Sequence, residues 1–277
     1  MLLLFVLLLL CHGLGTNHGS LVHGHSGDML SLLDFKRAIT NDPNRALASW
    51  NTSTPFCRWA GIACSRRHPG RITALKLSGQ KLKGEITPSL GNLTFLRTLN
   101  LSTNDFSGRL PPLGRLHKLE ILDLSTNSLH DTIPDALTNC SKLHILQLYM
   151  NSLVGEVHPR LGLLSELSIL DLSGNNLTGT IPPTLSNLTH LEGINLDYNN
   201  LSGSIPVELG KLSNLSMLDL GNAFSGHIPR TLGNLKQLVA LNLSYNNLDG
   251  NIPSNLGNLS RLQHLDLSNN KLRGIGP

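Results

Sequence analysis

Apolar residues recur at a fixed spacing along most of the chain. From Ile72 onward each copy follows L-x-x-L-x-L-x-x-N-x-L-x-G-x-I-P-x-x-L-x-x-L, and successive copies lie 23 or 24 residues apart. Because alternate residues of a strand point the same way, the central L-x-L predicts a strand with both leucines in the core. Stacked copies predict an α/β repeat solenoid with a parallel sheet about 40 Å long. The nine copies begin at Ile72, Leu96, Leu119, Leu143, Leu167, Leu191, Leu215, Leu238 and Leu262.

The polar and glycine positions of the pattern predict backbone geometry. The repeated asparagine follows the strand where the chain turns, and its amide can satisfy backbone groups that lose their sheet partners. We therefore expect a structural role for Asn104, Asn127, Asn151, Asn175, Asn199, Asn246 and Asn270. The repeated glycine predicts a bend with positive φ. In the third copy Asp131 takes this position, and aspartate tolerates that conformation better than most residues.

The N-terminal segment falls outside the pattern. Residues 2–10 form an unbroken apolar run that is too short to span a membrane and is typical of a secretory signal peptide. We interpret residues 1–25 as signal peptide and leader, 26–70 as an N-terminal cap, and 71–277 as nine repeats. Residues 28–36 predict an amphipathic helix with Asp28 as its N-cap. No membrane span is expected elsewhere.

Three copies depart from the pattern. The second is short around residues 110–114, and the seventh lacks one residue before Asn222. The deletion in the seventh copy should disturb the row of asparagines or bulge the strand. The ninth copy ends at Pro277 without a closing cap, which makes its apolar end a solubility liability. We interpret the chain as a truncated or alternatively spliced product or a gene fragment, in preference to one whose end a partner covers.

Composition and charge argue against several classes of function. Hydrophobic residues make up 40% of the chain and charged residues 14%, with a net charge of +4. These values disfavour disorder and a nucleic-acid-binding surface. No His or Cys pair has the spacing of a zinc site, and no Ser-His-Asp, nucleotide-binding or kinase motif is present. We expect no catalytic residue, no cofactor and no metal.

This pattern is the leucine-rich-repeat signature, and its Ile-Pro extension at residues 179–183 resembles the plant-specific subclass. Residues 88–96 and 133–141 resemble the ectodomains of plant leucine-rich-repeat receptor kinases, especially large immune-receptor-like ones. The resemblance implies a right-handed superhelix with the parallel sheet on its concave face and a helical N-terminal cap. Cys57 and Cys64 resemble the paired cysteines of that cap, and export to an oxidising compartment favours a disulfide between them. Trp50 and Trp59 are expected in the core of the cap.

The same resemblance implies extracellular recognition of a peptide or protein ligand in defence or development, with a co-receptor kinase as a second partner. The protein would be secreted, or lie on the outer face of the plasma membrane within a longer receptor. A secreted inhibitor of microbial cell-wall-degrading enzymes is the alternative. Such inhibitors resemble solenoids capped at both ends, and the absence of a C-terminal cysteine cap argues against this alternative.

The exposed face of the sheet is the surface on which solenoids recognise ligands. All three tyrosines of the chain fall on it, and tyrosine is a favoured interface anchor because it combines apolar area with a polar tip. Aspartate outnumbers lysine there, which favours a ligand with basic groups. The predicted ligand-binding residues are Gln147, Tyr149, Met150, Asp171, Asp197, Tyr198, Asp219 and Tyr245.

Ten Asn-x-Ser/Thr sequons predict glycosylation of an exported protein at some of these sites. Two of them, Asn100 and Asn242, lie between the strand leucines on the sheet face, where a glycan would block the surface. The full set is Asn51, Asn92, Asn100, Asn139, Asn176, Asn187, Asn200, Asn214, Asn242 and Asn258.

Overall fold

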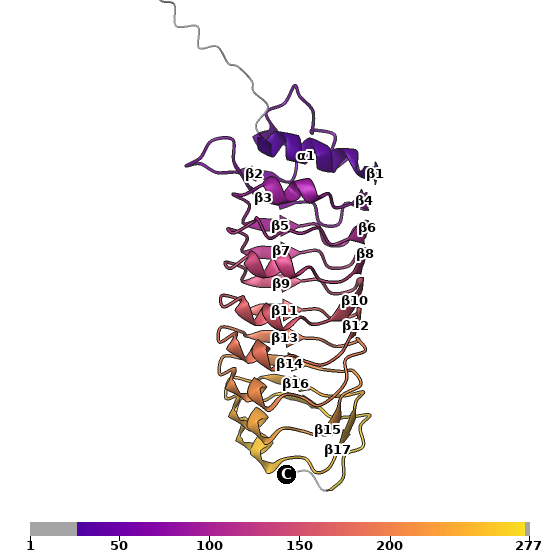
Figure 1. The fold of residues 1–277 in the computed structure, drawn as a ribbon, viewed down its shortest axis with the longest axis vertical. Helices are drawn as coiled ribbons and strands as arrows, with labels where there is room; N and C mark the ends of the chain where they lie inside the picture. Colours follow the sequence, from indigo (N-terminus) through magenta and orange to yellow (C-terminus); the bar gives the residue numbers. More distant parts are fainter. Residues whose placement is uncertain (1–26, 275–277) are drawn as a thin grey trace, which may run out of the picture.

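The chain forms a single stack of repeats with a helical cap at its N-terminal end (Figure 1). The computed structural model describes residues 27–274, so the proposed signal peptide lies outside the described residues. Helix α1, Gly27–Arg37, covers the first repeat, and the described C-terminal end lies at the opposite end of the stack. No helix in residues 27–274 is long and apolar enough to cross a membrane.

A ten-stranded sheet runs the length of the stack and forms its concave face. Nine of its strands are parallel and in register, one from each repeat, and the cap adds β2 as an antiparallel edge. The predicted repeat solenoid is confirmed. The strands are β2 (Ile62–Cys64), β3 (Ile72–Lys76), β5 (Thr98–Asn100), β7 (Ile121–Asp123), β9 (Ile145–Gln147), β11 (Ile169–Asp171), β13 (Gly193–Asn195), β14 (Met217–Asp219), β16 (Ala240–Asn242) and β18 (His264–Asp266).

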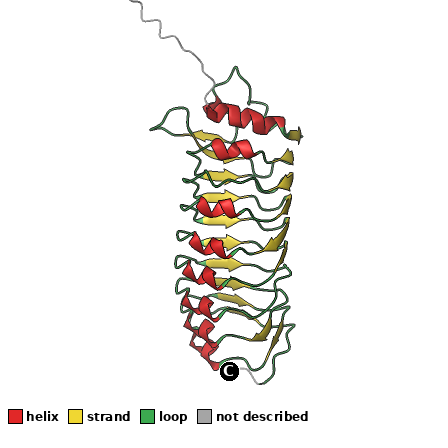
Figure 2. Cartoon of the chain, in the orientation of Figure 1, coloured by secondary structure: helices red, strands yellow, loops and turns green. Residues whose placement is uncertain are grey.

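A second set of short strands lies along another side of the stack (Figure 2). It forms a six-stranded sheet, interrupted at the sixth repeat, and a separate pair. The predicted bend positions, which lie within or directly after these strands, have positive φ, including 74° at Asp131. The six-stranded sheet contains β1 (Ile39–Asn41), β4 (Lys83–Glu85), β6 (Asp105–Arg109), β8 (Ser128–Asp131), β10 (Ser152–Glu156) and β12 (Asn176–Thr178), and the pair is β15 (Ser225–His227) and β17 (Asn247–Asp249).

Short 3-10 helices return the chain to the next repeat. The second repeat has none, because it is the copy that is shortened around residues 110–114. The cap contributes η1 (Phe56–Arg58), and the repeats contribute η2 (Pro88–Asn92), η3 (Asp135–Asn139), η4 (Pro159–Leu163), η5 (Pro183–Asn187), η6 (Val207–Lys211), η7 (Arg230–Asn234) and η8 (Ser254–Asn258).

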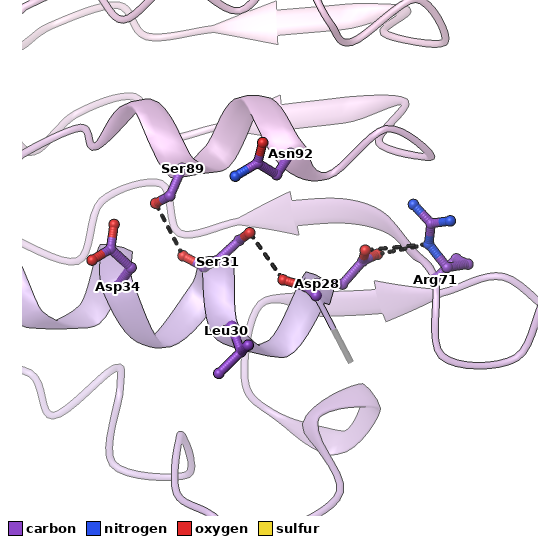
Figure 3. A pocket seen from close by; sticks show the side chains of 8 residues that line it. Asp28, Leu30, Ser31, Asp34, Arg71, Ser89 and Asn92 are labelled. Atoms are coloured by element: carbon purple, nitrogen blue, oxygen red, sulfur yellow. Dashed lines mark hydrogen bonds and ion pairs between the residues drawn. The ribbon is translucent and has the colours of Figure 1, made fainter. Parts of the chain in front are cut away.

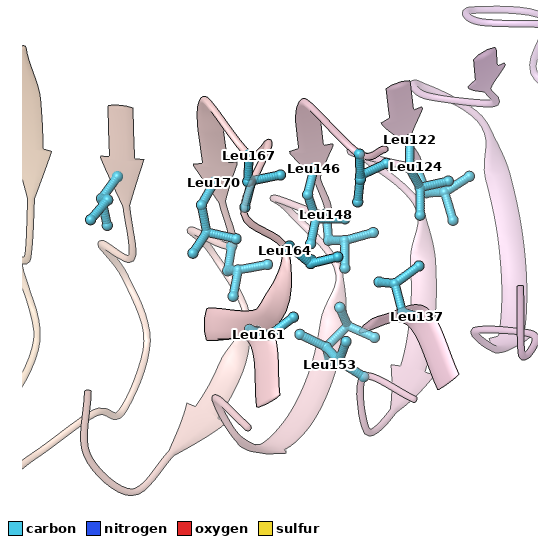
Figure 4. Packing of buried hydrophobic residues seen from close by; sticks show 14 of the residues in the cluster. Leu122, Leu124, Leu137, Leu146, Leu148, Leu153, Leu161, Leu164, Leu167 and Leu170 are labelled. Atoms are coloured by element: carbon cyan, nitrogen blue, oxygen red, sulfur yellow. The ribbon is translucent and has the colours of Figure 1, made fainter. Parts of the chain in front are cut away.

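Leucine side chains from every side of each coil meet in one continuous core (Figure 4). Leu170 of β11 and Leu161 and Leu164 of the η4 segment are each at most 1% exposed. Burying a leucine in this way contributes about 1.5–3 kcal/mol relative to leaving it exposed. Since each leucine also contacts neighbouring repeats, the core depends on stacking and not on any single repeat.

The repeated asparagines form a ladder that joins each repeat to the one before it. Asn175 is 7% exposed, and its Nδ2 donates to the carbonyl of Leu172 in its own repeat and to that of Leu148 in the preceding repeat, both at 3.0 Å. Its Oδ1 accepts the N–H of Leu153 at 3.0 Å. The side chain therefore satisfies backbone groups at the turn that have no sheet partner, as predicted.

The residue missing from the seventh repeat weakens this ladder, as expected, but leaves the strand regular. Asn222 still donates to the carbonyl of Leu196 in the preceding repeat at 2.9 Å. Among the hydrogen bonds of residues 27–274 it makes none to Leu220, the equivalent of Leu172 in its own repeat. Strand β14 pairs in register with both neighbours, so the expected alternative, a bulged strand, does not occur.

The cap is held by an aromatic core and a disulfide. Trp50 and Trp59 are 1% and 2% exposed and stack with ring centroids 5.3 Å apart, as expected for core residues. Cys57 and Cys64 form the predicted disulfide, with Cα atoms 5.5 Å apart. Phe35 of α1 contacts Phe106 of the second repeat, with ring centroids 5.8 Å apart, and so continues the repeat core into the cap.

The prediction that Asp28 caps the N-terminus of α1 is wrong. Asp28 lies within the first turn, 4% exposed, and its Oδ2 accepts the N–H of Ile72 at 2.8 Å. Its carboxylate also pairs with Arg71, at 3.2 Å. The side chain thus joins the cap to the first strand of the repeats, where β3 has no preceding repeat to pair with.

Asn175→Ala should destabilise the protein more than Asn222→Ala. The first change leaves several buried backbone groups without partners, at about 1–3 kcal/mol for each unsatisfied group, whereas Asn222 satisfies fewer. Urea denaturation followed by circular dichroism measures both free energies of unfolding. Equal losses in the two variants would show that the deletion does not weaken the ladder.

Candidate ligand-binding face

The exposed residues of the parallel strands form columns along the concave face. Directly between the two strand leucines lies the central column, in which Gln147, Asp171 and Asp219 occupy the predicted positions. Cross-strand pairing places Asp171 beside Gln147 and Asn195, and Asp219 beside Asn195 and Asn242. The central column consists of Lys76, Asn100, Asp123, Gln147, Asp171, Asn195, Asp219, Asn242 and Asp266.

The predicted tyrosines divide between two environments. Tyr149 comes first after its strand leucine and is half-buried. Met150, Tyr198 and Tyr245 come second, at φ values of 53°, 51° and 54°, and are 58%, 74% and 66% exposed. We call the residues at this second position the turn row. Sequence reasoning placed the tyrosines on one face but could not separate a half-buried position from an exposed one.

Aspartates of the central column normally find partners within their own repeat. Asp171 Oδ1 accepts the N–H of Ser173 at 3.0 Å and its hydroxyl at 2.7 Å. Asp123 is bonded in the same way to Ser125. The Asp-x-Ser sequence is therefore a local motif that satisfies its own carboxylate.

Asp219 departs from this arrangement. The residue two positions later is Gly221, which has no hydroxyl to donate, and the preceding repeat has Asp197 where the fifth repeat has Ser173. Asp219 instead accepts the Asn242 side-chain amide at 2.7 Å. Asp197 Oδ1 lies 2.3 Å from the position a Cβ on Gly221 would occupy, so the Asp197 side chain covers that glycine.

Burial perturbs both carboxylates, and the charge of Asp197 also acts on Asp219. Burial, followed by the charge of Asp197, raises the pKa of Asp219 to about 6, although bonds from Asn242 and from the Gly221 N–H oppose the rise. Burial also raises the pKa of Asp197, against the bond that its carboxylate accepts from the Tyr198 N–H. In contrast, the hydroxyl and N–H of Ser268 lower the pKa of Asp266. The two carboxylates therefore lack the serine hydroxyl donors that stabilise the charge of other aspartates on the face.

The shortened seventh repeat has no residue in the turn row, so this row has a gap beside Asp197 and Asp219. The missing residue is the one that would stand between Tyr198 and Tyr245 in that row. We call the resulting feature the notch, formed by Asp197, Tyr198, Asp219, Gly221 and Tyr245. Sequence reasoning identified four of these residues but missed Gly221, whose signal was the loss of the serine in the repeated Asp-x-Ser.

Acidic residues dominate the face around the notch. From the third repeat to the ninth, the face consists of the outward-facing strand positions and the two residues after each strand leucine. These positions hold no lysine or arginine and five aspartates, Asp123, Asp171, Asp197, Asp219 and Asp266. In the described part of the chain no cluster of three His, Cys, Asp or Glu side chains could hold a metal ion.

A separate hollow lies between α1 and η2, far from the notch in sequence (Figure 3). Its polar groups bond to one another: Ser31 Oγ donates to the Gly27 carbonyl at 3.0 Å, and Ser89 Oγ donates to the Ser31 carbonyl at 3.4 Å. Asp28 and Arg71 pair at its edge. This hollow is the seam between the cap and the first repeat.

The sequons divide between the concave face and the rest of the surface. Asn100 and Asn242 are half-buried, and their Nδ2 atoms donate to Asp123 at 3.0 Å and to Asp219 at 2.7 Å. A sugar on either amide would replace one of its two Nδ2 hydrogens and place a bulky group beside that carboxylate. The exposed sequon asparagines are Asn51, Asn92, Asn139, Asn176, Asn187, Asn200, Asn214 and Asn258.

Acidification should affect Asp219→Asn and Asp266→Gln in opposite directions. The raised pKa of Asp219 means that wild-type stability from this group is present at low pH and is lost as pH rises through about 6. The Tm of Asp219→Asn relative to wild type should therefore increase between pH 4 and pH 7. Asp266 has a lowered pKa, so Asp266→Gln, which creates no sequon, should lower the Tm at pH 7 and lose this effect on acidification. Parallel trends in the two variants would contradict the assignment.

Glycopeptide mass spectrometry of the secreted chain should find sugar among the eight exposed sequons and none on Asn100 or Asn242. Enzymatic deglycosylation marks each occupied asparagine by conversion to aspartate, so occupancy can be read site by site. A glycan on Asn242 would contradict the proposed bare surface beside the notch.

Family models match most of the described chain. The leucine rich repeat N-terminal domain matches residues 25–65, the leucine-rich repeat region matches 156–273, and the leucine rich repeat matches 95–115 and 118–140.

Curated relatives include plant receptor kinases. The LRR receptor-like serine/threonine-protein kinase EFR of Arabidopsis thaliana is 51% identical over 85 residues, which are 30% of this chain and 8% of the relative. The receptor kinase-like protein Xa21 of Oryza sativa subsp. japonica is 49% identical over 86 residues, 29% of this chain and 8% of the relative. The matched stretches thus span less than a tenth of these relatives.

Solved structures share the fold over most of the chain. The Arabidopsis thaliana GASSHO1/SCHENGEN3 ectodomain, in complex with CASPARIAN STRIP INTEGRITY FACTOR 2, has a TM-score of 0.88 at 37% identity and covers 90% of this chain and 30% of its own. The Arabidopsis receptor kinase HAESA, in complex with the peptide hormone IDA and the co-receptor SERK1, has a TM-score of 0.83 at 34% identity. The match spans 91% of this chain and 43% of the HAESA chain. A plant ice-binding protein has a TM-score of 0.70 at 30% identity, and the match spans 91% of this chain and 89% of that protein. With its repeats, paired-cysteine cap and concave sheet, the chain belongs to the plant leucine-rich-repeat proteins and is homologous to the leucine-rich-repeat receptor kinases.

Proposed function

We propose that this chain is a ligand-recognition module that binds a peptide or protein with basic groups on its concave face. The observation that carries the proposal is the Asp197–Asp219 pair, which lacks the serine partners found elsewhere in the column and has no lysine or arginine nearby on the face. A basic group of the ligand would supply the missing hydrogen-bond donors and balance the negative charge of the two carboxylates.

The residues around the pair suit such a ligand. Tyr198 and Tyr245 present exposed rings on either side of the gap in the turn row, and a cation can bind against a tyrosine ring as well as a carboxylate. Gln147, Tyr149, Met150 and Asp171 extend this surface toward the N-terminal repeats. The neighbouring structures of HAESA with a peptide hormone and of RGFR1 with RGF2 support a ligand of this class.

The biological setting that we propose follows from the homology. The module would act outside the cell, as part of a receptor-kinase-like protein in defence or development. It would bind without catalysing a reaction, because the chain carries no kinase motif. A co-receptor kinase would be a second partner, by analogy with the HAESA complex that contains SERK1.

Selection of a phage-displayed random dodecapeptide library on the secreted, glycosylated chain tests the proposal. At pH 7 the enriched peptides should contain an excess of lysine and arginine. The double variant Asp197→Asn/Asp219→Asn, which removes both carboxylates without creating a sequon, should bind them at least about tenfold more weakly, since a charge-assisted hydrogen bond contributes about 1.5–3 kcal/mol.

Asp105→Gln provides the control, because Asp105 is exposed on β6 of the second sheet, away from the central column, and glutamine removes the charge without creating a sequon. Its affinity for the same peptides should stay within about twofold of wild type. Enrichment of acidic peptides, or equal binding by the double variant, would overturn the proposal.

A further inference from the structure

A second column on the concave face is apolar in the middle of the stack. Ile121, Ile145 and Ile169 are cross-strand neighbours on β7, β9 and β11. The next two strands have Gly193 and Met217 at the same position. The three isoleucines are half-buried and Met217 is 39% exposed, although the face as a whole is open to solvent.

Gly193 does not interrupt this column. A Cβ added to it would lie 3.1 Å from Ile169 Cδ1 and 3.6 Å from Met217 Cε, so the two flanking side chains already lean over the glycine. The apolar surface is therefore continuous from Ile121 to Met217, and we call it the aliphatic stripe. It crosses five strands and is about 19 Å long at about 4.8 Å per strand. In the same column Thr98 precedes the stripe, and Ala240 and then His264 follow Met217.

The aliphatic stripe runs parallel to the acidic central column. Ile169 and Met217 lie two residues before Asp171 and Asp219 on the same strands. A ligand on this face would therefore meet an apolar row on one side and a carboxylate row on the other. A second copy of the same face is disfavoured as the occupant, because it would bring aspartate against aspartate.

We propose that the aliphatic stripe binds the apolar side chains of an extended peptide that lies along the solenoid axis with its basic side chains toward Asp171 and Asp219. The inference rests on the proposed function and adds the chemistry of the ligand. Side chains of an extended chain alternate in direction, so apolar and basic residues should alternate in the peptide. About six residues, at about 3.3 Å each, would cover the stripe.

Strand propensity alone would also favour isoleucine on these strands, so the test must separate binding from folding. Ile145→Thr/Ile169→Thr keeps β-branched residues and removes apolar surface. Met217→Gln changes an exposed side chain of similar length and provides a second variant if the double variant does not fold. Val154→Thr is the matched control, since Val154 is 40% exposed on β10 of the second sheet.

The experiment selects the same random dodecapeptide library and then measures the affinity of synthetic copies of two enriched peptides by isothermal titration calorimetry. We expect aliphatic residues to alternate with lysine or arginine. Ile145→Thr/Ile169→Thr and Met217→Gln should weaken binding at least about fivefold, and Val154→Thr should change it less than twofold. Circular dichroism confirms that each variant is folded.

The possible failures separate the two proposals. Basic peptides without enriched aliphatic residues, or unchanged affinity in the folded stripe variants, would overturn the role of the stripe and leave the acidic site in place. A selection with no excess of basic residues would overturn both. Loss of affinity in Val154→Thr equal to that in the stripe variants would also reject the stripe, because the effect would then not depend on the concave face.

Discussion

The fold depends on satisfying the backbone at the point where each coil leaves the concave sheet. A parallel strand of three residues ends abruptly, and the carbonyl and N–H groups beyond it have no sheet partner. Asn175 and its equivalents bond these groups within one repeat and in the preceding one. Because the same amide serves two repeats, the turn of one coil is complete only when its neighbour is present. This requirement, together with the shared leucine core, makes the stack cooperative.

Much of the polar surface of the concave sheet is explained by bonds within the repeats themselves. Asp-x-Ser satisfies its own carboxylate, so an aspartate in the central column carries no information about a ligand by itself. The informative positions are those where the local motif is incomplete. At the sixth and seventh repeats serine is replaced by Asp197 and Gly221, and one residue of the turn row is missing. The binding surface that we propose therefore lies where the sixth and seventh repeats depart from the repeat pattern.

The first repeat needs a different solution, because no preceding repeat completes it. Asp28 from α1 accepts the N–H of Ile72, and Phe35 extends the core beneath the helix. Strand β2 pairs with β3 and removes the open edge of the sheet. At the other end of the described chain β18 has no such partner, and Leu265 is 46% exposed.

The sequence alone determined the solenoid, the register of its strands and the structural role of the asparagines, because these follow from short-range spacing repeated nine times. The Cys57–Cys64 disulfide was implied by the resemblance to the plant family's paired-cysteine cap. It also identified the residues that face outward on the concave side. Only the tertiary structure showed that Asp28 bonds to the first repeat, that Tyr149 is half-buried while Tyr198 is exposed, and that Asp197 covers Gly221 beside Asp219. Those features depend on how individual side chains pack against residues distant in sequence, and a repeat pattern fixes which residues are neighbours but not how their side chains pack.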